Sequence, residues 1–208
     1  MYWVHRFGHG RRSKEFNDDL DIPAMCQLLK DKNCLTVGWL CFASTTENYN
    51  PDIVNAVENG NADKVMNLML NAGITRGWAR SLVNFTKMQV GDIVVVLPNK
   101  DYFPYFFVVE IKDSAKSILN SPPNMTTPFN VNGFDYNFSS NSGWSRSFGN
   151  EKNERFDVGF FHEVEILTDS LPRDLIGHTF DYVRSTNSPV HDVSTQQYIE
   201  SFIKKPKP

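Results

Sequence analysis

The residues best suited to hydrolytic chemistry are two carboxylates and a lysine in neighbouring segments. Asp92 follows Gly91 at the start of one apolar run, and Glu110-Ile111-Lys112 closes the next. If the two runs pair as a hairpin, Asp92 and Glu110 lie level, and such a set can hold Mg²⁺ and activate water. The pattern is short, no basic helix follows it, and a turn explains Asp92 fully. A metal-dependent nuclease is therefore one alternative function.

Flat aromatic side chains suit a different task, which is stacking on a planar base. Trp39 follows Gly38 at the end of an apolar strand, Trp78 begins a helix, and Trp144 lies in a polar segment that is rich in aromatics. Stacking is worth about 1–3 kcal/mol per base. Each ring has an ordinary alternative use in a hydrophobic core. The candidate base-binding residues are Trp3, Trp39, Trp78, Trp144 and His5.

Basic residues are too few for a broad phosphate-binding surface. The 208-residue chain has a formal net charge of -3, whereas domains that hold long DNA by phosphate contacts are usually basic. The densest basic cluster before the C-terminal lysines is Arg11-Arg12-x-Lys14. A solvated loop or face is the ordinary alternative for each of these residues. The candidate phosphate-binding residues are Arg6, Arg11, Arg12 and Arg80.

The cysteines and the hydropathy of the chain exclude several classes. Cys26, Cys34 and Cys41 form no C-x-x-C pair, and no histidine cluster has metal-ligand spacing, so we expect neither a metal nor a cofactor. The first residues lack the apolar run of a secretory signal, and no stretch is apolar enough to cross a membrane. An odd number of cysteines indicates a reducing compartment. We therefore predict a cytoplasmic location and no membrane partner.

The elements that must position these residues follow from the hydrophobic periodicity. It predicts strands over 2–7, 35–40, 93–97, 105–111 and 156–167, with a hairpin between the third and the fourth. It predicts helices over 21–30, 51–72 with a break at Gly60-Asn61, and 78–88, and short helices over 171–180 and 198–203. Strands joined by long and varied connections favour a mixed or antiparallel sheet over a doubly wound one.

Residues 113–155 depart from this pattern. They are dominated by Asn, Ser, Pro and Gly, yet they contain scattered aromatic residues, which fully disordered segments usually lack. We expect an ordered or partly ordered insertion loop that packs over a single domain spanning residues 1–208. Residues 204–208, which are rich in lysine and proline, are expected to form a flexible basic tail.

Several short motifs, taken in order, resemble the EVE and YTH-like branch of the PUA superfamily. The resemblance is strongest to the EVE-like modules found beside, or fused to, bacterial modification-dependent restriction proteins. It covers much of residues 1–112 and, more thinly, 156–190. The motifs are Tyr2-Trp3-Val4-His5-Arg6, Leu35-Thr36-Val37-Gly38-Trp39, Trp78-x-Arg80-x-Leu82-x-x-Phe85, Met88-x-x-Gly91-Asp92-Ile93-Val94-Val95-Val96, and Phe160-Phe161-His162-x-Val164 followed by Leu171-Pro172-Arg173.

The resemblance implies a fold and a function. The fold is α+β, a small twisted mixed or antiparallel β-barrel with flanking helices. The function is a non-catalytic module that binds DNA, RNA or a nucleotide and reads a modified or flipped base in an aromatic pocket. Extruding a base costs a few kcal/mol, which stacking and hydrogen bonds to the base edge offset. The resemblance also implies a place in a bacterial restriction or defence system, beside a co-encoded nuclease or NTPase subunit.

Two other functions stay open at this point. The first is a Mg-dependent nuclease of the PD-(D/E)xK type that uses Asp92, Glu110 and Lys112, although the proline of that motif is missing. The second is a protein-interaction subunit of a larger complex, suggested by the aromatic residues of 129–148. An exposed apolar patch on that segment would favour the second.

Overall fold

The computed structural model describes residues 1–7, 18–43, 49–121, 123–149, 154–168, 170–180 and 187–203. The predictions made for Arg11, Arg12, Lys14 and the 204–208 tail therefore lie outside the described residues.

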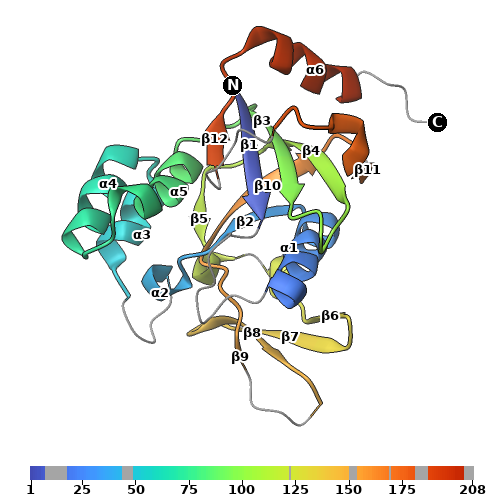
Figure 1. The fold of residues 1–208 in the computed structure, drawn as a ribbon. Helices are drawn as coiled ribbons and strands as arrows, with labels where there is room; N and C mark the ends of the chain where they lie inside the picture. Colours follow the sequence, from blue (N-terminus) through green and yellow to red (C-terminus); the bar gives the residue numbers. More distant parts are fainter. Residues whose placement is uncertain are drawn as a thin grey trace.

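A curled mixed sheet forms the centre of the molecule (Figure 1). Along the sheet the strands follow the order β12-β1-β3-β4-β10-β2, while β11 pairs with β4 and β5 with β10. Only the β1–β3 pairing is parallel among the strand pairs of this sheet that the structure describes. The sheet forms a half-barrel, so the expected α+β class with a mixed sheet is confirmed. The bounds are β1 (Tyr2–Phe7), β2 (Cys34–Val37), β3 (Ile93–Pro98), β4 (Tyr105–Ile111), β5 (Lys116–Ser117), β10 (Phe160–Ile166), β11 (Leu171–Pro172) and β12 (Asn187–Pro189).

Six α-helices surround this sheet in the described part of the chain. The predicted break at Gly60-Asn61 is confirmed, because Gly60 adopts a φ of 65° and Asn61 caps the next helix by accepting a hydrogen bond from the Lys64 amide. None of the helices among the described residues combines the length and the apolar character that a membrane span requires. The bounds are α1 (Asp18–Lys32), α2 (Leu40–Ala43), α3 (Pro51–Glu58), α4 (Ala62–Asn71), α5 (Arg76–Thr86) and α6 (Val193–Ile203).

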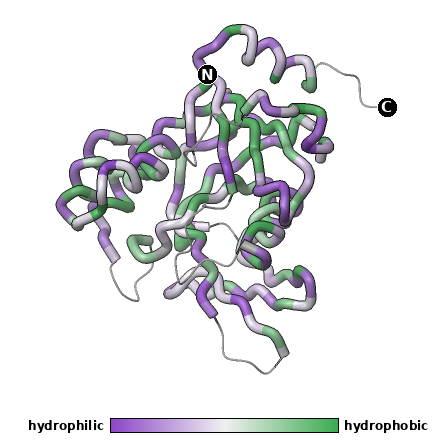
Figure 2. Tube along the Cα trace, viewed as in Figure 1, coloured by the Kyte–Doolittle hydropathy of each residue, from purple (hydrophilic) through white to green (hydrophobic). Residues whose placement is uncertain are grey.

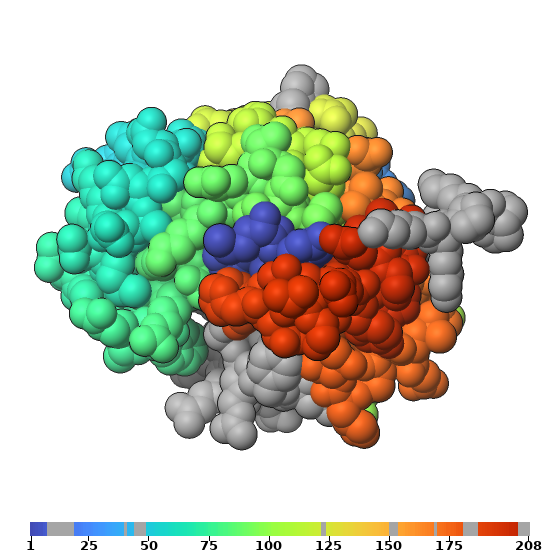
Figure 3. All heavy atoms as spheres, turned by 90° about the horizontal axis from the view of Figure 1, so that it is seen from above, coloured from blue at the N-terminus to red at the C-terminus, as the bar shows by residue number. Residues whose placement is uncertain are grey.

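Both faces of the central strands are buried, which explains their unbroken apolar runs (Figure 2). In β3, Val94 and Val96 belong to the cluster that packs against α1 and α3–α5, whereas Val95 and Leu97 belong to the cluster that packs against α6. In space-filling view the α3–α5 lobe and the α6 segment lie on opposite sides of the N-terminal residues (Figure 3). The sheet therefore has a face toward α5 and a face toward α6.

Within residues 113–155, where we expected an insertion loop, four strands between Phe129 and Arg155 form a second sheet, while β5 belongs to the central sheet. An antiparallel meander runs β6 (Phe129–Val131), β7 (Phe134–Ser139), β8 (Gly143–Ser147) and β9 (Glu154–Arg155). The Asn132-Gly133 turn between β6 and β7 has φ values of 53° and 84°, which suits a two-residue hairpin. Alternation in Phe134–Ser139 places the aromatic residues on one face. The abundance of Asn, Ser, Pro and Gly in this part of the chain had favoured a loop instead.

Buried polar contacts tie the small sheet to α1. Arg146 pairs with the fully buried Asp21 and, at 2.9 Å, with Glu154, and the Tyr136 hydroxyl donates to the Leu20 carbonyl at 3.0 Å. Burial raises the pKa of the Tyr136 phenol well above its usual value. The aromatic face of the sheet thus packs against its own chain, and Phe148, which is 50% exposed, is its one large exposed hydrophobic side chain among the described residues. One such ring is ordinary for a protein surface.

Two predicted boundaries are wrong for a common reason. The short helix predicted over 171–180 is instead β11, which pairs with β4, followed by a 3₁₀ turn at Arg173–Ile176. The strand predicted over 35–40 ends at Val37, and α2 begins at Leu40. In both places a tertiary partner decides the local conformation, which a periodicity cannot reveal.

Candidate functional site

The turn between β2 and α2 holds Trp39 in an unusual backbone conformation. Trp39 has a φ of 71°, the left-handed region that costs a non-glycine residue about 1–2 kcal/mol. Its ring stacks on Phe42, with centroids 5.9 Å apart and planes at 19°, and its Nε1 donates to the Ser81 hydroxyl at 2.9 Å. The ring is only half-buried. The turn therefore fixes an indole while leaving part of it open to solvent.

Gly38 lets this turn approach a carboxylate closely. A Cβ atom at Gly38 would lie 2.6 Å from Oδ2 of Asp157, which is closer than real Cβ contacts. The residue before Trp39 must therefore be glycine for this arrangement to form without moving Asp157. The result is a hydrogen-bond acceptor directly beside the Trp39 turn.

A polar network connects the Trp39 turn to the ends of the sheet. The Ser81 hydroxyl, which accepts from Trp39, donates to the Trp78 carbonyl at 3.0 Å, so α5 supports the indole. Asn187 of β12 donates to the Ser81 carbonyl at 2.8 Å, and its side-chain oxygen lies 2.5 Å from Nδ1 of His5. His5 is fully buried, so its side chain is not exposed for contact with a base in this structure. It lies in the network that positions α5.

Trp3, unlike Trp39, is enclosed by the protein, and it lies past the C-terminal end of α5. Its Nε1 donates to Oδ2 of Asp92 at 2.8 Å, and the same carboxylate accepts from the Gln89 amide at 3.0 Å. Trp3 is only 3% exposed, so it is a core residue that cannot stack on a base without unfolding the β1–β3 edge. Asp92 is accounted for as the acceptor that orders this turn.

His162 lies near this end of α5. Its Nδ1 and Nε2 are 2.8 and 2.9 Å from the carbonyl oxygens of Asp113 and Phe85. Burial lowers the pKa of the His162 imidazole below its ordinary value, because the charged ring would lose its hydration. The side chain joins β10 to the last turn of α5.

The remaining candidates are spread over the molecule. Trp144 is 1% exposed in the small sheet, where its ring edge meets Phe129 and Phe138, so it is neither a cage wall nor a lid. Trp78 is 51% exposed at the start of α5. Arg6 lies on the face toward α6 and donates from Nη2 to the Phe180 carbonyl at 2.5 Å, a structural contact that uses one of its donors.

The nuclease pattern does not assemble in this structure. Asp92 shares the α5 face of the sheet with Val94, whereas Glu110, which pairs with Ile93, shares the opposite face with Val108. Lys112 is bound at 2.6 Å by Glu165 and at 2.9 Å by Glu110, and hydrogen bonds to these carboxylates raise the pKa of its amine. Alternation along the strands therefore separates the two acids that one metal would need. Among the described residues no group of three or more His, Cys, Asp or Glu side chains has the arrangement to hold a metal ion.

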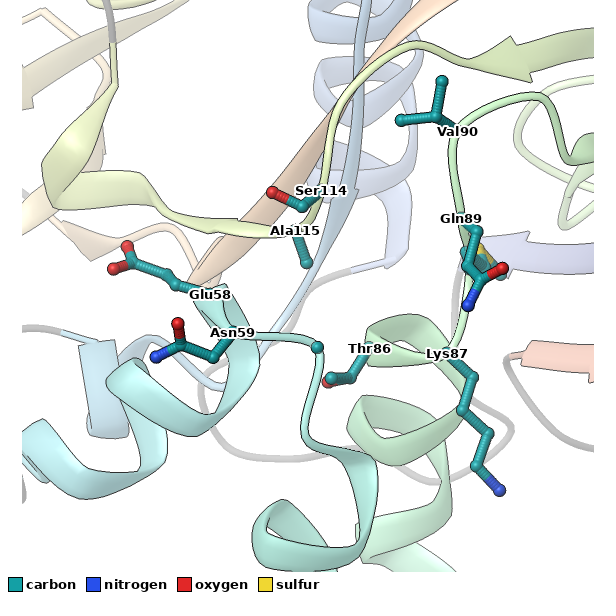
Figure 4. A pocket seen from close by; sticks show the side chains of 10 residues that line it. Glu58, Asn59, Thr86, Lys87, Gln89, Val90, Ser114 and Ala115 are labelled. Carbon is teal, nitrogen blue, oxygen red and sulfur yellow. The ribbon is translucent and has the colours of Figure 1, made fainter.

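A pocket of about 360 Å³ lies at the C-terminal ends of α3 and α5 (Figure 4). Its one acidic side chain, Glu58, accepts hydrogen bonds from the Ser117 amide at 3.0 Å and from Asn120 at 2.5 Å. None of its lining residues was a predicted site residue, and Trp39 is not among them. The lining residues are Glu58, Asn59, Gly60, Thr86, Lys87, Met88, Gln89, Val90, Ser114 and Ala115.

Comparisons of this chain with protein-family models, curated proteins and solved structures found no match. The assignment of a site therefore depends on the geometry alone.

Sequence reasoning missed three residues that shape the Trp39 turn. Ser81 had a detectable signal, since it is a small polar residue within the apolar stretch of the predicted helix. Asn187 and Asp157 had none, because β12 and the approach to β10 meet the site only through pairings with distant strands.

Proposed function

We propose that this chain is a non-catalytic nucleic-acid or nucleotide-binding module of the PUA/EVE-like kind, which holds a modified or flipped base against Trp39. The observation that carries the proposal is the half-buried Trp39 ring, set on a left-handed backbone and fixed by Ser81. A module without chemistry of its own would serve a bacterial restriction or defence system beside a nuclease or NTPase subunit.

Backbone strain supports a binding role for Trp39. A left-handed conformation costs about 1–2 kcal/mol at a bulky residue, and such outliers concentrate at ligand sites. A tryptophan that served only the core would gain most from full burial, as Trp3 and Trp144 do. Trp39 has a strained backbone although its ring is not fully buried. This combination fits a ring that is available for stacking.

The chemistry beside Trp39 suits the edge of a base. An ionised carboxylate only accepts hydrogen bonds, so Asp157 would favour a base edge that donates, such as the exocyclic amino group of cytosine or adenine. Stacking contributes about 1–3 kcal/mol, which offsets the few kcal/mol needed to extrude a base. A slightly acidic protein can bind in this way, because the base and not the phosphate supplies the recognition.

Binding of a ligand panel to Trp39 variants tests the proposal. The panel consists of mononucleotides and short DNA and RNA strands, with cytosine, 5-methylcytosine, 5-hydroxymethylcytosine or methylated adenine, at one stated salt concentration. We expect Trp39→Ala to weaken binding about 5- to 150-fold, corresponding to about 1–3 kcal/mol. Trp39→Phe keeps a stacking ring and should retain most of the affinity.

Tyr105→Ala is the control, because Tyr105 is an aromatic residue that is open to solvent (41% exposed) but lies on β4. Each variant is first checked for a native unfolding transition, so that lost binding is separated from lost folding. Wild-type affinity in Trp39→Ala, or a wild type that binds no member of the panel, would contradict the proposal.

A further inference from the structure

Helix α5 carries a row of basic side chains on its exposed side. Arg76, Arg80 and Lys87 are four and seven residues apart, a spacing that puts them on one side of a helix, and all three are exposed. From Lys64 to Gly91 the sequence has four basic residues, Lys64 included, and no acidic one, although the whole chain has a net charge of -3. Positive charge is therefore concentrated on this helix.

Within the part of the chain that the structure describes, these charges have no ion-pair partner. None of the ion pairs among the described residues includes Arg76, Arg80 or Lys87. Arg76 is the first residue of α5, where the helix dipole disfavours a cation by about 0.3–1 kcal/mol. Arg76 therefore does not serve the stability of the helix, whereas the dipole favours Lys87 at the C-cap. An external anion would be a favourable partner for the row.

The row begins in the first half of α5, which also carries Ser81, and extends to the C-terminal end of the helix. Arg80 precedes Ser81, whose hydroxyl holds the Trp39 indole, and Trp78, 51% exposed, lies in the same first turns of α5. From Arg76 to Lys87 the helix rises about 16 Å, at 1.5 Å per residue. Along a DNA duplex each strand advances about 3.4 Å per phosphate, so the row spans four to five phosphates of one duplex strand. A single nucleotide reaches only one end of such a row.

We infer that the exposed side of α5 binds the phosphate backbone of a nucleic-acid strand whose base stacks on Trp39. The inference rests on the proposed function and deepens it, since it selects a polynucleotide over a free nucleotide as the ligand. A local row of this kind reconciles nucleic-acid binding with the acidic character of the rest of the chain, because counterions are released only where phosphates meet cations.

The salt dependence of binding tests the inference. The probes are single-stranded DNA and RNA of about 12 nucleotides, long enough to pass the whole row, the matching duplex, deoxycytidine monophosphate, and phosphatidylserine vesicles. Arg76→Gln/Arg80→Gln is compared with Lys30→Gln/Lys100→Gln, which removes the same charge from exposed lysines on α1 and the β3–β4 turn. Each neutralised phosphate contributes about 0.7 to the slope of log K against log salt for single strands and about 0.9 for duplexes.

The expected result is a slope reduced by about 1.4–1.8 in Arg76→Gln/Arg80→Gln and unchanged in the lysine control. Equal slopes in both variants would overturn the inference that this row binds phosphates. The proposed function would still stand, provided that Trp39→Ala still weakens binding. Deoxycytidine monophosphate bound as tightly as the oligonucleotides would overturn the choice of a polynucleotide. Phosphatidylserine vesicles bound through the row, with no oligonucleotide bound, would make it a lipid-binding surface. A wild type that binds none of the probes would overturn both proposals.

Discussion

Near the two ends of α5, two tryptophans make nearly identical hydrogen bonds in opposite surroundings. Past the C-terminal end, Trp3 donates its indole proton to Asp92 at 2.8 Å and is almost fully buried. Toward the N-terminal end, Trp39 donates to Ser81 at 2.9 Å, stays half-buried and has a left-handed backbone. The hydrogen bond therefore does not separate a core tryptophan from a candidate site. Burial and backbone conformation do.

The two acceptors also differ in charge. Asp92 presents a carboxylate that takes several donors and orders the turn before β3. Ser81 presents a neutral hydroxyl, which itself donates a hydrogen bond to the Trp78 carbonyl. The side chains of Trp3, Asp92 and His162 are buried, so we call their end of α5 the sealed end, although a pocket opens beside them at Thr86–Val90. We call Trp39 and the Ser81 that holds it the open end, because the Trp39 ring is only half-buried. We expect the sealed end to control stability and the open end to control binding.

The largest expected effect is that of Trp3→Ala. Emptying a buried tryptophan site costs about 3–5 kcal/mol in the free energy of unfolding, because packing on the α5 face of the sheet is lost. Trp39→Ala should cost clearly less, since the Trp39 ring is only half-buried. Urea denaturation of both variants measures the difference, and equal losses would remove the distinction between the two ends.

A smaller difference is expected between the two acceptors. Asp92→Ala leaves the buried Trp3 indole without its partner and should cost about 1–3 kcal/mol. Ser81→Ala should cost no more than about 1 kcal/mol, because water can reach the half-buried Trp39. Calorimetry checks this, since each 1 kcal/mol shifts Tm by about 2–4 °C in a chain of this size. A larger drop in Tm for Ser81→Ala would reverse the assignment.

The sealed end should also respond to pH through His162. Because burial lowers the folded-state pKa of this histidine, the unfolded chain binds the proton first as the pH falls. Stability is then full above about pH 6.5 and declines below it by at most about 1.4 kcal/mol per pH unit. Unfolding free energies at several pH values, compared with those of His162→Gln, isolate the contribution. An unchanged slope in His162→Gln would show that other groups are responsible.

The smallest effect concerns the backbone of the open end. At ordinary helix or strand positions glycine is less stable than alanine, but a left-handed residue reverses that order. We expect Trp39→Gly to be more stable than Trp39→Ala by about 0.5–1 kcal/mol, because glycine adopts a φ near 71° without strain. Parallel urea titrations of the two variants measure this difference. A less stable Trp39→Gly would mean that the turn relaxes in solution.

Much of the fold could be predicted from local sequence. The strands at 2–7 and 105–111, and the division of 51–72 into α3 and α4, agree with the structure because their periodicity and capping residues act within a few positions. The small sheet at 129–155 was missed, although Phe134–Ser139 alternates clearly. The sheet was missed because the loop prediction followed the polar composition of the segment and not the two-residue period of its aromatic residues.

The candidate site was less predictable, and three tryptophans show why. From the sequence, Trp3, Trp39 and Trp144 are all candidate base-binding rings. Only packing separates them, since β3, α5 and Asp92 enclose Trp3, and the aromatic face of the small sheet encloses Trp144. A base-binding role for Trp39 stays a prediction until it is measured.

By itself, the sequence determined the α+β class and most helices and strands, because apolar periodicity and turn residues act over a few neighbouring positions. Tertiary structure alone decided that Asp92 and Glu110 lie on opposite faces, that His5 is buried, and that Trp39 stays partly open beside Ser81. These outcomes depend on contacts between residues far apart in the chain, which no local pattern encodes.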